Sequence, residues 1–415
     1  MENAVPKIEG HATFYAHLKA GKIDEARVIG LDGERFVEKI LVGRKFFEAP
    51  IITSRICGIC PVIHNVTSTR AIEDAIGISP TPQTVLLRKL MLCGQMIQSH
   101  SLHLYLLVLP DFFGCSSSFE LQKNHPDLFQ NAISLKRFSD FIVEKIGGRA
   151  VHPVANVPGG FKHFPSQKDL TDIIEMSKIN QEIAIQTLKL FFDLSYPDIH
   201  RAFNYCALKK RGEYAYYDGT ITGTSGESFE ANEYKNYIYE ELVPYNPAKF
   251  ATLRGKEIEV GAIARLNLSS QHLHPEVLTL IKEKNLTLPL DNPFQNTIAQ
   301  AIENLHFIIE TGKIAENLKK DGIKEEKIIE PKSFGIGTGA SEAPRGTLFH
   351  HYELDKEGFI HKADVITPTV QNLPSMESDM IKLNKIIKDK TKSERDRLIE
   401  MLIRAYDPCI TCATH

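Results

Sequence analysis

Two pairs of cysteines, one near each end of the 415-residue chain, constrain the fold more than any other feature of the sequence. The first pair is Cys57 and Cys60, and the second pair is Cys409 and Cys412, just before the chain ends. Each C-x-x-C pair can give two thiolates to one metal, and four thiolates suit zinc, nickel or iron. A site that joins both ends of so long a chain has to lie deep inside the folded body.

The simplest alternative is a structural zinc site with four cysteine ligands. Such sites usually take both cysteine pairs from a short stretch of sequence, because they stabilise small domains. The wide separation of the two pairs therefore favours a functional metal centre over a structural zinc site.

The composition excludes several other classes of protein. With 42% hydrophobic and 24% charged residues and a net charge of −3, the chain is an ordinary globular sequence without the basic surface expected for nucleic-acid or membrane binding. It contains no apolar run long enough to span a membrane and no signal peptide at its start, although a partner protein could carry an export signal. Seven cysteines are typical of a reducing compartment, and we interpret three of them as buried apolar groups: Cys93, Cys115 and Cys206.

Hydrophobic periodicity and capping residues predict three long helices, over residues 81–109, 167–194 and 292–320. The first begins at Thr81-Pro82, ends before Pro110 and is apolar on most sides, as expected for a buried helix. Shorter helices are predicted over 34–43, 61–76, 375–389 and 393–405, with strands over 5–31 and a hairpin over 347–366. We therefore expect a mainly α fold with smaller β elements (α+β) around a central bundle of long buried helices. Residues 1–415 are expected to form a single domain with a β-rich insertion near 212–262.

Both cysteine motifs resemble those of the large, catalytic subunit of nickel–iron hydrogenases. The family patterns are R-x-C-G-x-C with a histidine four residues on, here His64, and D-P-C-x-x-C-x-x-H, and both are present without departure. A weaker motif, Lys7-Ile8-Glu9-Gly10-His11, resembles the family's R-I-E-G-H with lysine in place of arginine. Residues 147–153 resemble its G-G-R-x-x-H-P segment, so the resemblance covers essentially the whole chain.

The resemblance implies a nickel–iron centre in which Cys60 and Cys412 bridge the two metals while Cys57 and Cys409 bind nickel alone. It further implies carbon monoxide and cyanide ligands on the iron. Glu38 and His415 match the ligands of a structural magnesium-type ion. Family precursors are cut after this histidine, so the chain resembles the processed form, or a product made without an extension.

Further residues match groups that surround the metals in the family. Arg345 matches an arginine above the metals, where a guanidinium can donate two parallel hydrogen bonds. Thr369 matches a hydroxyl donor to a cyanide, and His64 matches a histidine that hydrogen-bonds the bridging Cys60. Asp111 and Asp407 match carboxylates expected to pair with Arg345 or to orient it. The alternatives are a surface salt bridge for the arginine, a helix-end residue for Asp111 and a turn residue for Asp407.

Glu9 matches the family's proton carrier. A carboxyl group that takes a proton from a thiol has to lie within hydrogen-bond distance of it and in a buried environment. The resemblance implies that Glu9 receives the proton from Cys409. The alternative is an ordinary solvent-exposed glutamate on a strand.

The implied activity is the reversible oxidation of dihydrogen by an oxidoreductase. The chain has no spare cysteine cluster, so we expect an iron–sulfur small subunit to receive the electrons. The sequence favours a cytoplasmic enzyme that reduces NAD(P) through flavin-bearing diaphorase subunits; the alternative is a deazaflavin- or ferredoxin-linked enzyme. A non-catalytic relative that has lost its cysteines is disfavoured, because all four are present.

Overall fold

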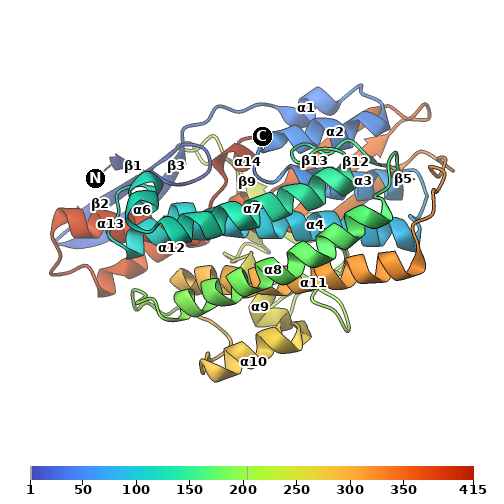
Figure 1. The fold of residues 1–415 in the computed structure, drawn as a ribbon. Coiled ribbons are helices and arrows are strands. Elements are labelled where there is room, and N and C mark those ends of the chain that lie inside the picture. Colours follow the sequence, from blue (N-terminus) through green and yellow to red (C-terminus); the bar gives the residue numbers. More distant parts are fainter. Residues whose placement is uncertain (1, 203) are drawn as a thin grey trace.

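Four long helices form the centre of the molecule in the computed structural model, which describes residues 2–202 and 204–415 (Figure 1). They are α4 (Pro82–Leu102), α7 (Pro126–Gly147), α8 (Gln167–Phe192) and α11 (Asn296–Asp321). Helix α4 packs against α7 and α11, and α8 packs against the same two helices, so the four form a closed group. The expected mainly α fold with a central bundle is confirmed.

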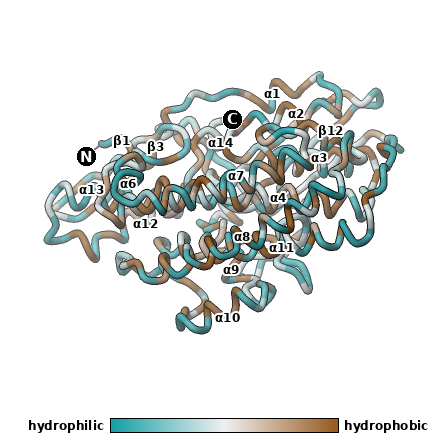
Figure 2. Tube along the Cα trace, viewed as in Figure 1, coloured by the Kyte–Doolittle hydropathy of each residue, from teal (hydrophilic) through white to brown (hydrophobic). Residues whose placement is uncertain are grey.

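The burial of each helix follows from its pattern of apolar side chains. Helices α4 and α11 are buried on nearly every side, whereas α7 and α8 carry apolar residues on one face and polar residues on the other (Figure 2). Helix α8 starts with the capping box of Ser166 and Asp169, whose side chains each accept a hydrogen bond from the other's backbone N–H. Helix α7 had no counterpart among the predicted elements.

The prediction that the first long helix ends before Pro110 is wrong. After Leu102 the chain forms a π-helical segment, η3 (His103–Val108), and then continues into α5 (Leu109–Phe112). Pro110 lies in the first turn of α5, where a missing backbone N–H costs no hydrogen bond. The wider π turn allows the helical path to continue, and it sets where Asp111 lies.

Two three-stranded antiparallel sheets flank the bundle, one near the N-terminus and one formed by residues 336–366. The N-terminal sheet has the order β1 (Glu2–Ala4), β2 (Ala12–Lys19) and β3 (Lys22–Gly30). The second sheet consists of β11 (Ile336–Ala343), β12 (Gly346–Leu354) and β13 (Ile360–Ile366), with the predicted hairpin as its last two strands. Between 206 and 253 lie five short strands: β6 (Cys206–Lys209), β7 (Thr220–Gly223), β8 (Ser228–Phe229), β9 (Ile238–Glu241) and β10 (Phe250–Leu253).

Glycines in β11 allow this strand to pack directly on helix α3 (Pro61–Ala75). A Cβ atom on Gly337 would lie 2.2 Å from the carbonyl oxygen of Ala71, and one on Gly339 would lie 2.7 Å from that of Thr67. Because no side chain fits there, the glycines are required for close helix–strand contact. The same contact brings β12 towards the start of α3, beside the first cysteine pair.

The remaining elements complete the shell around this core. The predicted helix over 34–43 is confined to α1 (Val37–Leu41), and the one over 375–389 runs earlier, as α12 (Pro368–Lys382). The other elements are α2 (Ala49–Thr53), α6 (Ser118–Asn124), β4 (Asn156–Val157), β5 (Gly160–Phe161), α9 (Ala262–Ser269), α10 (Pro275–Glu283), α13 (Lys392–Ala405) and α14 (Ile410–Ala413). Across the part of the chain that the structure describes, no helix has the length and apolar character needed to cross a membrane.

Candidate metal centre

The four paired cysteines meet at one buried point. Their sulfur atoms all lie within 4.8 Å of one another, with 3.5 Å between Cys57 and Cys409 and 3.2 Å between Cys60 and Cys412. Each cysteine is at most 4% exposed. Elsewhere in residues 2–202 and 204–415, no group of three or more histidine, cysteine, aspartate or glutamate side chains lies close enough to hold a metal.

Local structure at both ends of the chain brings the pairs together. Cys60 caps α3 just before Pro61, and Cys409 caps the short helix α14. The backbone N–H of Ile410 donates to the carbonyl oxygen of Glu9 at 3.0 Å, which ties the C-terminal motif to the N-terminal segment. The guanidinium of Arg35 donates to the carbonyl oxygens of Ile56 and Thr411, one beside each cysteine pair.

Arg35 is a residue whose structural role the sequence analysis missed. It precedes Phe36, which has a left-handed backbone conformation (φ 51°) although it is neither glycine nor asparagine. The arginine contacts only backbone atoms of the two motifs, so its role depends on how distant loops meet.

The four cysteines can be thiolates together only when a cation neutralises them. Burial raises the pKa of the Cys409 and Cys412 thiols well above their ordinary value. Hydrogen bonds from Cys409 and the other thiols lower the pKa of Cys57 well below the ordinary value. Four thiolates in so dry a place would repel one another strongly, and metal ions remove this cost. The donor set of four soft sulfurs therefore fits nickel and iron.

Arg345 and Asp407 form the expected pair beside the cysteines. Arg345 donates from Nε to the carbonyl oxygen of Asp407 at 2.6 Å and from Nη2 to its Oδ1 at 2.9 Å. Both side chains are buried, and Gln300 donates to the other carboxylate oxygen of Asp407 at 3.1 Å. Ser99 lies 3.4 Å from Nη1 of the same arginine. The arginine is therefore held rigidly, and not by a surface salt bridge.

Asp111 does not pair with Arg345, and that expectation is wrong. Its two oxygens accept hydrogen bonds from Arg404 at 2.6 and 2.9 Å, and Oδ1 also binds Lys7 at 2.6 Å. Lys7 is the residue that stands in place of the family's arginine. The carboxylate thus anchors the N-terminal segment, which carries Glu9 two residues after Lys7, to helix α13.

Glu9 lies against the terminal cysteine of the second pair. Its Oε2 is 2.9 Å from the sulfur of Cys409, and the hydroxyl of Thr411 lies 2.8 and 2.6 Å from its two oxygens. The side chain is half-buried, unlike an ordinary exposed glutamate on a strand. Thr411 was not singled out from the sequence, and its position inside the second cysteine pair was the available signal.

His64 and Thr369 both reach the centre, and the partner predicted for the histidine is wrong. Nε2 of His64 is 3.8 Å from the sulfur of Cys412, not that of Cys60, because its helix turns the ring towards the second pair. The hydroxyl oxygen of Thr369 accepts a hydrogen bond from the backbone N–H of Cys409 at 3.0 Å. Its own proton is then free to donate into the small cavity that it lines with Arg345 and the cysteines.

Glu38 and His415 come together near the same end of the molecule. Nε2 of His415 is 3.8 Å from Oε1 of Glu38, and that oxygen also accepts a hydrogen bond from the N–H of Val365 at 2.8 Å. Nζ of Lys249 is 3.9 Å from the other Glu38 oxygen and 3.1 Å from Glu240. The Glu38 carboxylate offers oxygen ligands of the kind that a hard cation prefers, His415 offers an imidazole nitrogen, and the ammonium of Lys249 partly balances the carboxylate charge.

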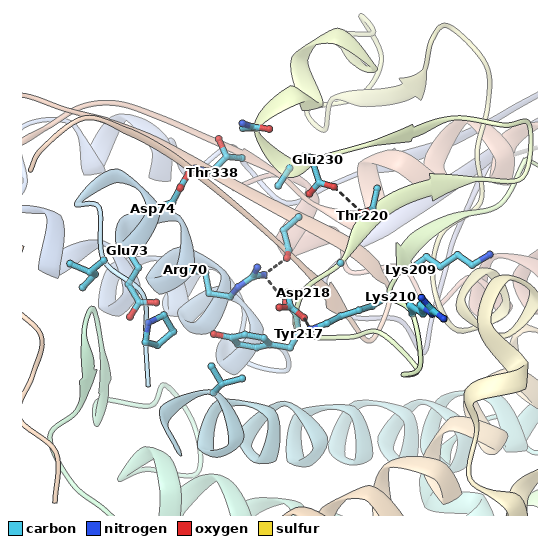
Figure 3. A pocket seen from close by; sticks show the side chains of 18 residues that line it. Arg70, Glu73, Asp74, Lys209, Lys210, Tyr217, Asp218, Thr220, Glu230 and Thr338 are labelled. Atoms are coloured by element: carbon cyan, nitrogen blue, oxygen red, sulfur yellow. Dashed lines mark hydrogen bonds and ion pairs between the residues drawn. The ribbon is translucent and has the colours of Figure 1, made fainter. Parts of the chain in front are cut away.

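A second pocket, open to solvent, lies apart from the cysteines. It has a volume of about 860 Å³ and lies among α3, β11 and the segments around β7, and no cysteine lines it (Figure 3). Within it, Arg70 donates to the carbonyl oxygen of Tyr217, and Lys210 binds Asp218 at 2.6 Å. Because none of the four paired cysteines lines it, this pocket is separate from the candidate metal centre.

Comparison with known proteins agrees with this geometry. The family model described as nickel-dependent hydrogenase matches residues 35–137 and 156–415. The chain is 33% identical to the alpha chain of sulfhydrogenase 1 of Pyrococcus furiosus, with 99% of this chain and 96% of the relative covered. It is 32% identical to the alpha chain of sulfhydrogenase 2 of the same organism, over 99% of this chain and 97% of the relative. Identity to the beta chain of the NAD-reducing hydrogenase HoxS of Cupriavidus necator is 27%, with coverages of 99% and 93%.

Solved structures show the same fold. A crystal structure of an NAD⁺-reducing [NiFe]-hydrogenase in the H₂-reduced state matches with a TM-score of 0.89 and 25% identity, over 100% of this chain and 99% of that one. The [NiFeSe]-hydrogenase of Dm. baculatum matches in fold with a TM-score of 0.81 and 22% identity, with coverages of 100% and 99%. The chain belongs to the nickel-dependent hydrogenase family. It is the large, catalytic component of such an enzyme, an oxidoreductase that acts on dihydrogen.

Proposed function

We propose that the four cysteines hold a nickel–iron centre, with Cys60 and Cys412 bridging both metals and Cys57 and Cys409 on nickel alone. The observation that carries this proposal is the convergence of four buried sulfurs from the two chain ends within 4.8 Å. The iron would carry carbon monoxide and cyanide as its further ligands, as the resemblance to the family implies.

When bound, this centre supplies the heterolytic cleavage of dihydrogen. The sulfur of Cys409 accepts the proton and passes it to Oε2 of Glu9, which lies 2.9 Å away. The hydroxyl of Thr411 holds the Glu9 carboxylate against the sulfur. A carboxylate within hydrogen-bond distance is the nearest base to which a thiol in this dry site can give its proton.

The side chains around the cysteines orient the iron ligands and the substrate. Arg345 presents a fixed positive charge because Asp407 and Ser99 hold its guanidinium. Thr369 donates its hydroxyl proton to a cyanide, and His64 donates to the sulfur of Cys412. Asp111 supports the site by holding Lys7 and Arg404.

The electrons leave through an iron–sulfur small subunit. The outer face of the first cysteine loop supports this proposal, because Gly58 is exposed while the cysteines on either side are buried. We further propose a cytoplasmic enzyme that passes electrons through flavin-bearing diaphorase subunits to NAD(P). The relative with a NAD-reducing name supports that acceptor, and a deazaflavin- or ferredoxin-linked enzyme of the same family is the second candidate.

Two structural parts of the proposal concern the whole chain. A magnesium-type ion is held between Glu38 Oε1 and His415 Nε2, which lie 3.8 Å apart. Residues 1–415 form one domain, because helices α4, α7, α8 and α11 pack as one group and the metal centre draws on both chain ends.

Metal analysis tests the proposal. The protein purified from its source organism should contain nickel and iron and should show infrared bands from diatomic ligands on iron. It should oxidise dihydrogen as a complex with an iron–sulfur protein. Stoichiometric zinc without such bands would refute the nickel–iron centre and favour a structural zinc site.

A further inference from the structure

A row of buried polar side chains runs from the sulfur of Cys412 into the core. Nδ1 of His64 lies 3.1 Å from Nε2 of His350, and Nδ1 of His350 lies 2.9 Å from the hydroxyl of Tyr352. That hydroxyl is 2.8 Å from the hydroxyl of Ser68. All four side chains, which we name the His64 relay, are at most 1% exposed.

One helix and one strand carry the four residues of the relay. His64 and Ser68 are one turn apart on α3 and share a face of that helix, whereas His350 and Tyr352 are two residues apart on β12 and share a face of that strand. The glycines of β11 bring this sheet against α3 and so close the distance between the two faces. The arrangement is therefore built into the fold rather than into a mobile loop.

Only one direction of hydrogen bonding satisfies every group of the relay when Cys412 is a thiolate. Both rings are fully buried, and a neutral imidazole carries one N–H and one acceptor nitrogen. A thiolate only accepts. Tyr352 then donates to Nδ1 of His350, whose Nε2–H donates to Nδ1 of His64 and leaves the Nε2–H of His64 for the sulfur.

We propose that His350 is a positioning residue that, with Tyr352 behind it, fixes the tautomer and orientation of His64 so that its N–H points at Cys412. The inference rests on the proposed function, in which Cys412 bridges the two metals. A hydrogen bond to a thiolate ligand withdraws electron density from the sulfur and hence from the metals. Within the described residues the relay ends in the core at Ser68, so it orients the ring and does not lead a proton to solvent.

The test uses variants of the enzyme purified from its source organism and the infrared bands of the iron ligands. His350→Leu removes the donor to His64, so the sulfur regains electron density and the bands should move to lower wavenumbers. His350→Gln offers an amide N–H in a similar place, so its bands should lie close to the wild-type positions. Tyr352→Phe keeps the packing but removes the hydroxyl, and should produce a smaller shift in the same direction.

A matched control lies next to His350 on the same strand. His351 points to the opposite face, where its Nδ1 binds the hydroxyl of Thr338 at 2.8 Å, so His351→Gln should leave the bands in place. Metal-loaded His350→Leu and Tyr352→Phe with bands at wild-type positions would overturn the inference. If His350→Leu fails to load metals, Tyr352→Phe alone tests the inference. Bands at wild-type positions in metal-loaded Tyr352→Phe would then overturn it. Wild-type protein without any such bands would refute the nickel–iron centre itself, and this inference with it.

Discussion

The thiol of Cys409 donates a hydrogen bond to the carboxylate of Glu9 across 400 residues of sequence, with 2.9 Å between Sγ and Oε2. A backbone contact reinforces the pair, because the N–H of Ile410 donates to the carbonyl oxygen of Glu9. The proposed base and the proposed proton donor are therefore held together by the main chain as well as by their side chains. This rigidity makes Glu9 the most direct point at which to test the proton path.

Glu9→Gln should abolish steady-state oxidation of dihydrogen and isotope exchange with solvent protons, by roughly 100-fold or more. Glutamine keeps the size and one acceptor oxygen but cannot take a proton, while the metals still assemble because Glu9 is not one of their proposed ligands. Conversion between para- and ortho-dihydrogen should survive, since cleavage itself does not need Glu9.

Glu34→Gln, in an exposed carboxylate of the loop that precedes α1, is the matched control and should retain full activity. Normal turnover of Glu9→Gln with normal metal content would exclude Glu9 as the proton carrier and move the path to another residue.

Arg345→Lys should lower the turnover number roughly 100-fold while nickel and iron remain bound. Lysine keeps the positive charge but lacks the rigid planar fork that donates from Nε to the carbonyl oxygen and from Nη2 to Oδ1 of Asp407, so the charge is held less firmly in place. Dihydrogen oxidation and metal content should be measured on the same preparations. Arg211→Lys, at an exposed position, serves as the control, and equal turnover of both variants would contradict the proposed role of Arg345.

Gly58→Trp should separate this chain from the proposed iron–sulfur partner. A Cβ on Gly58 would meet no atom within 4 Å, so the indole fits the isolated chain but projects from the exposed face of the cysteine loop. We expect nickel to stay bound, while the iron–sulfur partner no longer co-purifies and dihydrogen oxidation is lost. Gly58→Ala adds only a methyl group and should retain the complex. A Gly58→Trp protein that still purifies as the intact complex would place the partner on another face.

Glu377→Gln should stabilise the protein above pH 7 and have little effect near pH 5. Burial raises the pKa of Glu377 to about 7, so its carboxyl group favours folding only while protonated, and that contribution is lost as the pH rises from about 4.5 through 7. Above that window the ionised, partly buried carboxylate costs on the order of 2 kcal/mol, which glutamine avoids. Glutamine can still accept the hydrogen bond from the N–H of Val28.

Calorimetry at pH 5 and pH 8 tests this pH dependence by comparing the melting temperatures of wild type and Glu377→Gln. The variant should melt higher than wild type at pH 8 only. An equal difference at both pH values would show that the carboxyl group does not titrate in this range.

Much of the metal centre was readable from residue identity and spacing. Four cysteines in two C-x-x-C pairs, with no other pair in the chain, predicted which sulfurs meet, because ligand chemistry leaves few other uses for them. The capping box at Ser166 and the apolar run after Thr81 likewise predicted where α8 and α4 begin, since these signals act over one helical turn.

Other features were decided only when distant elements packed together. Pro110 predicted a helix end, but the π-helical turn before it carried the chain onward. Asp111 could have paired with any of several arginines, and the position of helix α13 selected Arg404. Which cysteine sulfur His64 reaches depended on the rotation of α3 against β11 and β12. The sequence by itself determined which groups can bind metal and where helices start, because those properties are local. The tertiary structure decided the partner of each charged or polar side chain, because such pairing depends on contacts between segments far apart in the chain.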